Sequence, residues 1–142
     1  MIILDTNVIS EPFAKNPDLR VAAWFDAQSA ETLYLTTVTV GELRYGIAAM
    51  PAGRRRDEYA AWLEERTLPA FTGRILPYDL VATSEYARLR AAARAAGLAV
   101  ATADGMIAAT AAAAGFAVAT RDTSPFKAAG VPTIDPWQSE ER

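Results

Sequence analysis

Four acidic residues occupy positions from which their carboxylates could act together. These residues are Asp5, Glu42, Asp104 and Asp122. Each one either follows a predicted strand or lies in the first turns of a predicted helix. In an open parallel sheet, the carboxyl ends of the strands and the starts of the helices that follow them meet at one edge. We therefore expect the four carboxylates to converge there.

Converging carboxylates require a cation, because unpaired negative charges at close range would force at least one group to take up a proton. Mg²⁺ and Mn²⁺ suit such a site, since both prefer oxygen ligands. An ion of this kind can generate hydroxide from bound water and neutralise the charge that develops on a phosphodiester during hydrolysis. The four acids thus predict metal-dependent hydrolysis.

The composition excludes most other enzyme chemistry. The 142 residues include no His and no Cys, which removes Ser-His-Asp triads, His-ligated zinc, thiolate sites and disulfides. The net charge is -3 and the sequence pI is about 5.0, whereas an obligate DNA-binding domain is usually far more basic. Binding of a nucleic acid would therefore depend on a metal ion and on local arginines.

Each of the four acids also has a purely structural interpretation. Asp5 could cap the next helix, and Asp104 could be a first-turn acid that the helix dipole favours. Glu42 could pair with Arg44 or Arg74. Asp122 could cap a turn. Position alone leaves these alternatives open.

Two further acids, Asp79 and Asp135, stand at similar strand ends. Asp79 precedes a long predicted helix, so we expect it to be the N-cap of that helix. Asp135 precedes Pro136-Trp137, which is typical of a turn. We therefore leave both acids out of the predicted site.

Short apolar segments alternate with helical patterns along the chain. Strands are predicted over about 2–4, 33–36, 74–77, 116–120 and 131–134, and helices over about 17–28, 40–50, 54–68, 80–96 and 103–114. Continuous apolar strands of this kind are typical of parallel sheets buried on both faces. The order of elements predicts an α/β domain.

The length suits one ordinary domain, which we place at residues 1–138, followed by a short tail at 139–142. No apolar run approaches the roughly 20 residues of a membrane span. The first residues include neither a basic region nor a signal peptide. We expect no membrane contact and a cytoplasmic location.

Four segments in order resemble the PIN-domain family, and specifically the VapC-type toxins of bacterial toxin–antitoxin pairs. They are Ile3–Ile9, Thr37–Gly46, Ala103–Ala111 and Val118–Asp122, and Pro136-Trp137 matches the usual ending. Any one segment alone would be a weak match. All four in order, spread over the whole domain, are a specific one.

This resemblance implies a three-layer α/β/α sandwich and an endoribonuclease that depends on Mg²⁺ or Mn²⁺. Asp5, Glu42 and Asp104 match the three central acids of the family, each of which would be a metal ligand. Asp122 matches a position where the family often has Asn, followed three residues later by an acid. Here that later residue is Pro125, so we expect Asp122 to supply the charge that Pro125 lacks.

The resemblance also implies supporting residues and partners. The side chains expected to orient the ligands are Thr6, Asn7, Thr120 and Ser124. Arg44 and Arg121 are candidates for contacts with RNA phosphates, whereas the run Arg54–Arg56 more often marks a solvated helix face. A homodimer and a VapB-type antitoxin that blocks the site are the expected protein partners.

Two other functions remain open at this point. One is a PIN nuclease that acts on DNA or in RNA processing, although such relatives often have extra domains for which this chain leaves little room. The other is a catalytically silent module of a DNA-binding complex, against which the intact set of Asp5, Glu42 and Asp104 argues. A Rossmann-type phosphate site is excluded, because no Gly-x-Gly-x-x-Gly or Walker motif follows Leu4.

Overall fold

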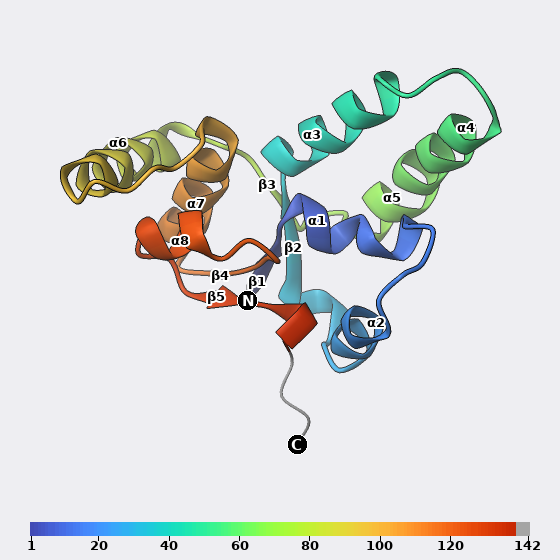
Figure 1. The fold of residues 1–142 in the computed structure, drawn as a ribbon, viewed down its shortest axis with the longest axis horizontal. Coiled ribbons are helices and arrows are strands. Elements are labelled where there is room, and N and C mark those ends of the chain that lie inside the picture. The colour runs from blue at the N-terminus through green and yellow to red at the C-terminus, as the bar shows by residue number, and fades with distance from the viewer. Residues whose placement is uncertain (139–142) are drawn as a thin grey trace.

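A five-stranded parallel sheet forms the centre of the computed structural model, which describes residues 1–138 (Figure 1). Its strands are β1 (Ile2–Leu4), β2 (Leu33–Thr36), β3 (Ile75–Leu76), β4 (Ala117–Ala119) and β5 (Thr133–Ile134). They lie in the order β3-β2-β1-β4-β5, so the first strand is in the middle. The predicted α/β class with a parallel sheet is confirmed. The predicted tail at 139–142 lies outside the described residues.

Helices flank this sheet and form two arms on either side of it. The helices are α1 (Thr6–Ile9), α2 (Leu19–Asp26), α3 (Thr37–Ala48), α4 (Arg54–Ala61), α5 (Leu68–Ala70), α6 (Leu80–Ala95), α7 (Thr102–Ala114) and α8 (Ser124–Ala128). Figure 1 shows α3 and α4 in one arm and α6 and α7 in the other. Within the described part of the chain, no helix is long and apolar enough to cross a membrane.

Two hydrophobic cores lie on opposite faces of the sheet. Neighbouring side chains of a strand point to opposite faces, and the fully buried pair Ile3 and Leu4 of β1 divides accordingly. Leu4 belongs to the core formed with α1, α2 and α3, and Ile3 to the core formed with α6, α7 and α8. The predicted three-layer arrangement follows from these two cores.

Side-chain caps start two helices immediately after the central strands. Asp5 follows β1, and its carboxylate accepts a hydrogen bond from the backbone of α1. Thr36 ends β2, and its hydroxyl accepts one from the N–H of Thr39 in α3. Such caps satisfy N–H groups that the first turn leaves unpaired. Residues at the starts of α1 and α3 are therefore brought to the carboxyl edge of the sheet.

Some elements differ from the predicted ones. The predicted helix over 54–68 includes a π-helical section at Trp62–Thr67, which separates α4 from α5. Three 3₁₀ segments at Glu11–Phe13, Ala30–Thr32 and Pro136–Gln138 were not predicted either. The helices α1 and α8 were missed because each is too short to show a helical period, and tertiary packing must stabilise them.

The buried face of α8 generates a prediction about stability. Phe126 is fully buried, whereas Lys127 is exposed. We expect Phe126→Ala to lower the free energy of unfolding by about 3–5 kcal/mol, because it leaves a cavity in the core. Lys127→Ala should change it by less than about 0.5 kcal/mol. Urea unfolding measures both, and similar values for the two variants would contradict the assigned packing of α8.

Candidate active site

Asp5 is the buried acid at the carboxyl edge of the sheet, with 5% of its surface exposed. Its Oδ1 accepts a hydrogen bond from the backbone N–H of Thr6 at 2.8 Å, and its Oδ2 accepts one from the hydroxyl of Thr120 at 2.8 Å. Burial raises the pKa of the Asp5 carboxyl to about 6, although these two hydrogen bonds act to lower it. The negative charges of Asp104 and Glu42 raise it further.

Glu42 lies in the second turn of α3, on the exposed surface. Its Oε1 accepts a hydrogen bond from the hydroxyl of Thr6 at 2.8 Å. Thr6 therefore contacts two acids, Asp5 through its backbone and Glu42 through its side chain. The alternative that Glu42 pairs with Arg44 or Arg74 is wrong, since Arg44 binds Glu64 and Arg74 donates to backbone carbonyl oxygens.

Asp104 and Asp122 complete the set on the other side of Asp5. Asp104 lies in the first turn of α7 but is not its cap, because Ala101 stands at that position. Partial burial raises the pKa of Asp104, and the charges of Glu42 and Asp122 raise it further. Asp122 is exposed in the segment between β4 and α8. Each of the four acids is thus close enough to affect at least one other electrostatically.

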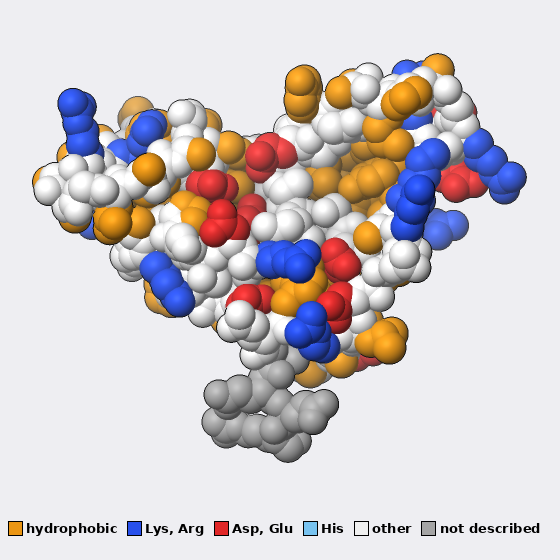
Figure 2. All heavy atoms as spheres, viewed as in Figure 1, with side chains coloured by type: hydrophobic (Ala, Val, Ile, Leu, Met, Phe, Trp, Pro, Cys, Tyr) orange, Lys and Arg blue, Asp and Glu red, His pale blue; other side chains and the backbone are white. Residues whose placement is uncertain are grey.

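The four carboxylates do not form a compact set of ligands. Among residues 1–138, no three acidic side chains lie in an arrangement that could hold a metal ion. Like charges repel, and the carboxylates of Asp5 and Glu42 each lie against a hydroxyl donor. Figure 2 shows acidic side chains on the surface between the two arms. That the four carboxylates bind one metal ion together therefore stays a prediction.

Two of the predicted supporting side chains link the neighbouring segments. The amide nitrogen of Asn7 lies 3.4 Å from Oδ2 of Asp5, and its amide oxygen accepts a hydrogen bond from the backbone of Arg121 at 3.2 Å. Thr120 is fully buried, and its hydroxyl also lies 3.3 Å from the carbonyl oxygen of Asp122. Asn7 and Thr120 thus connect α1 with the chain beyond β4.

Ser124 is not brought to the acids by any contact in the described part of the chain. It is exposed and begins α8, where Pro125 occupies the first turn. Proline suits this place because a first-turn N–H has no partner within the helix. The departure from the family pattern at Pro125 therefore coincides with the start of a helix.

The predicted RNA-contacting arginines have different surroundings. Arg44 forms a bidentate ion pair with Glu64, with distances of 2.8 and 3.0 Å. The guanidinium carbon of Arg121 lies 5.0 Å from the centre of the Trp137 ring. Arg44 is thus already paired with a carboxylate, whereas Arg121 is held through its own backbone N–H, which donates to Asn7.

The residues left out of the site have structural contacts. Asp79 caps α6 by accepting a hydrogen bond from the N–H of Ala82 at 2.9 Å. Asp135 accepts one from the N–H of Trp137 at 2.9 Å. Arg54 forms an exposed ion pair with Glu58 one turn later, as a solvated helix face would.

Comparisons with known proteins agree with the sequence motifs. The PIN domain family matches residues 2–131. The VapC ribonuclease Y4jK of Sinorhizobium fredii is 59% identical over 138 residues, which are 97% of this chain and 99% of that protein. The toxin FitB of Neisseria gonorrhoeae is 47% identical over 137 residues, 96% of this chain and 99% of its own.

A solved structure extends this similarity to three dimensions. The crystal structure of FitAcB from Neisseria gonorrhoeae superposes with a TM-score of 0.95 at 47% identity, covering 98% of this chain and 100% of the other. This chain therefore resembles the FitAcB structure in both sequence and fold along almost its whole length. The chain belongs to the PIN-domain family, and its relatives there include a VapC ribonuclease and a FitB toxin.

Proposed function

We propose that this protein is a metal-dependent endoribonuclease and the toxin of a toxin–antitoxin pair. The observation that carries the proposal is the buried carboxylate of Asp5, which interacts electrostatically with Asp104 and Glu42 at the edge of the sheet where ligands bind. The names of the relatives, VapC ribonuclease and toxin FitB, support the same activity and the same role.

The donor atoms at this edge suit a hard divalent cation in their chemistry, although no three acids among residues 1–138 are positioned to ligate one. The acids offer only oxygen donors, which Mg²⁺ and Mn²⁺ prefer. Burial raises the pKa values of Asp5 and Asp104, and the neighbouring carboxylates raise them further, so a bound cation would stabilise the ionised forms. Asp5, Glu42 and Asp104 would hold the ion, with Asp122 as the fourth ligand. A bound Mg²⁺ or Mn²⁺ would supply hydroxide from water and neutralise charge on the phosphodiester.

The neighbouring side chains keep these carboxylates oriented. Thr6 holds Glu42 through its hydroxyl and Asp5 through its N–H, so the two acids on different elements stay in a fixed relation. The hydroxyl of Thr120 holds the other oxygen of Asp5. Such supporting hydrogen bonds orient ligands and commonly affect metal affinity when they are removed.

The proposal includes partners and a place of action. RNA in the cytoplasm is the substrate, and a VapB-type antitoxin neutralises the toxin by covering the site. A homodimer is the proposed assembly, and it could bury apolar surface such as Leu80 and Val81 at the start of α6, which are 85% and 64% exposed. Large exposed apolar side chains often mark such contacts.

The first prediction of this proposal concerns RNA cleavage. The antitoxin-free protein should cleave cellular RNA into discrete products in Mg²⁺ or Mn²⁺, and EDTA should prevent cleavage. Asp5→Asn and Asp104→Asn should each lower the rate at least about 100-fold, because they remove ligand charge but little volume. Gel analysis of the products measures the rate.

Asp135→Asn is the matched control, since it makes the same chemical change at a strand end outside the site. It should cleave RNA at close to the normal rate. Normal activity of Asp5→Asn, or loss of activity in a folded Asp135→Asn protein, would show that the wrong acids were chosen. Cleavage of DNA but not of RNA would favour the alternative substrate.

The second prediction concerns stability without metal. Because the pKa of Asp5 is about 6 in the folded protein against an ordinary value of 3.8, the folded state binds the proton more tightly. The free energy of unfolding should therefore fall as the pH rises from about 4 to 6, by up to about 3 kcal/mol. This contribution of Asp5 to the free energy of unfolding is fully present below about pH 4 and is lost above about pH 6.

Urea unfolding in EDTA, over this pH range, tests the second prediction. Asp5→Asn should lack most of this fall, while Asp135→Asn should keep it. Addition of Mg²⁺ above pH 6 should restore stability in the unsubstituted protein, since an ion that binds only the folded state stabilises it. A parallel pH dependence in the unsubstituted and Asp5→Asn proteins would contradict the assigned burial of the charge.

A further inference from the structure

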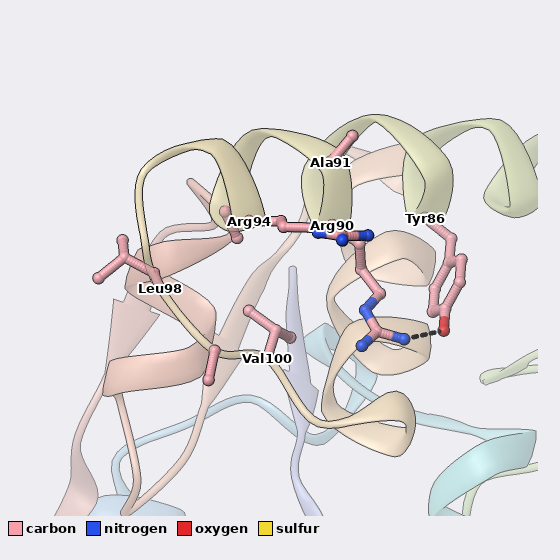
Figure 3. Close-up of a pocket in the computed structure, with 8 residues that line it drawn as sticks. Tyr86, Arg90, Ala91, Arg94, Leu98 and Val100 are labelled. Atoms are coloured by element: carbon pink, nitrogen blue, oxygen red, sulfur yellow. Dashed lines mark hydrogen bonds between the residues drawn. The ribbon is translucent and has the colours of Figure 1, made fainter.

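A basic cavity lies between α6 and the segment that leads into α7. Its volume is about 570 Å³, within the range of small-molecule sites. Its lining includes two arginines, Arg90 and Arg94, and no acidic residue, although the net charge of the chain is -3. In Figure 3, Leu98 and Val100 lie on the loop that follows α6, and Val100 is on the side that faces these arginines. The cavity therefore combines positive charge with an apolar wall.

The basic side of the cavity is one face of α6. Tyr86, Arg90 and Arg94 are spaced four residues apart, which places them along the same side of the helix. Arg90 donates a hydrogen bond from Nη1 to the hydroxyl of Tyr86 at 2.6 Å, as Figure 3 shows. This contact holds the guanidinium of Arg90 at the cavity without using a negative charge.

This face of α6 packs directly on the turn that contains Asp104. The next residue, Gly105, has no side chain, and a Cβ there would lie 3.2 Å from Cε2 of Tyr86 and 3.4 Å from Cδ of Arg90. Tyr86 and the stem of Arg90 thus contact the first turn of α7. Because Gly105 directly follows Asp104 in the first turn of α7, two of the residues that line the cavity lie against the turn that carries Asp104.

The two cavity arginines differ from a third arginine of the same helix. Arg88 forms an ion pair with Glu85, whereas Arg90 and Arg94 have no carboxylate partner among residues 1–138. A cation near the end of a helix interacts favourably with the helix dipole, which could account for Arg94. The dipole does not account for Arg90, which lies a turn earlier and faces the same cavity.

We propose that this cavity is a subsite for a backbone phosphate of the substrate RNA. The inference rests on the proposed function. An RNA strand with one phosphate at Asp104 must continue across the neighbouring surface, and its next phosphates need cationic partners. The guanidinium groups of Arg90 and Arg94 match a phosphate in charge and in fork-like geometry. The apolar part of the lining would face the adjoining sugar or base.

A comparison of two variants of α6 tests the subsite. Arg94→Gln removes a cavity charge, and Arg88→Gln removes a charge of the same helix outside the cavity. Both are made in the full chain with Asp104→Asn, so that binding is measured without cleavage. The probe is a fluorescent single-stranded RNA that contains a mapped cleavage sequence, titrated at several salt concentrations.

We expect Arg94→Gln to weaken RNA binding about tenfold, as loss of a charge-assisted hydrogen bond does. The slope of log affinity against log salt should become shallower by about 0.7, the value for one phosphate contact with a single strand. Arg88→Gln should change neither quantity. Arg90→Lys, which keeps the charge but loses the fork, should also weaken binding, and thermal unfolding verifies that each variant is folded.

Equal effects of Arg94→Gln and Arg88→Gln would overturn the subsite, because any surface charge would then serve. Unchanged RNA binding with a weaker antitoxin complex in Arg94→Gln would overturn it too, and would assign the cavity to an acidic segment of the antitoxin. If the unsubstituted protein cleaves RNA but Arg94→Gln binds normally, only the subsite fails. If it neither binds nor cleaves RNA, the proposed function fails as well.

Discussion

The hydrogen bonds of one buried carboxylate, that of Asp5, hold the candidate site together. Asp5 follows the central strand, and its backbone N–H donates to Ala119 of β4 at 2.9 Å. Its side chain accepts from Thr6 at the start of α1 and from Thr120 just beyond β4. Because β1 lies between β2 and β4, these bonds connect segments more than 100 residues apart in sequence. The relative positions of the other acids depend on this junction.

The same burial makes Asp5 unfavourable as an ion. Its hydrogen bonds favour the charged form, yet they do not overcome desolvation and the negative potential of Asp104 and Glu42, so the pKa rises to about 6. A compensating positive charge would remove this cost. A divalent cation would do so for several carboxylates at once, which couples metal binding to folding stability. Without a bound ion, the hydroxyl and amide donors around Asp5 keep its oxygens oriented.

The sequence predicted the framework well and the ligand geometry poorly, for a physical reason. The short apolar strands and the long helices have clear periodicity, and their order determines an α/β sheet. The rule for strand ends identified Asp5, but it applied equally to Asp79 and Asp135, which prove to be local caps. Only the lateral order of strands, which depends on long-range packing, decides which strand ends are adjacent. The distances between carboxylates depend further on contacts such as that between Thr6 and Glu42.

The surroundings of the arginines also depend on packing that the sequence does not reveal. Arg44 was predicted to contact RNA phosphates, yet it is paired with Glu64 in the π-helical section that follows α4. The spacing of Tyr86, Arg90 and Arg94 is visible in the sequence, but nothing there shows that Gly105 lets this face of α6 approach Asp104. In an acidic protein, the mean charge says little about where a polyanion can bind. The proposed subsite depends instead on two cations without carboxylate partners among residues 1–138, Arg90 and Arg94, of which Arg90 packs against the turn that carries Asp104.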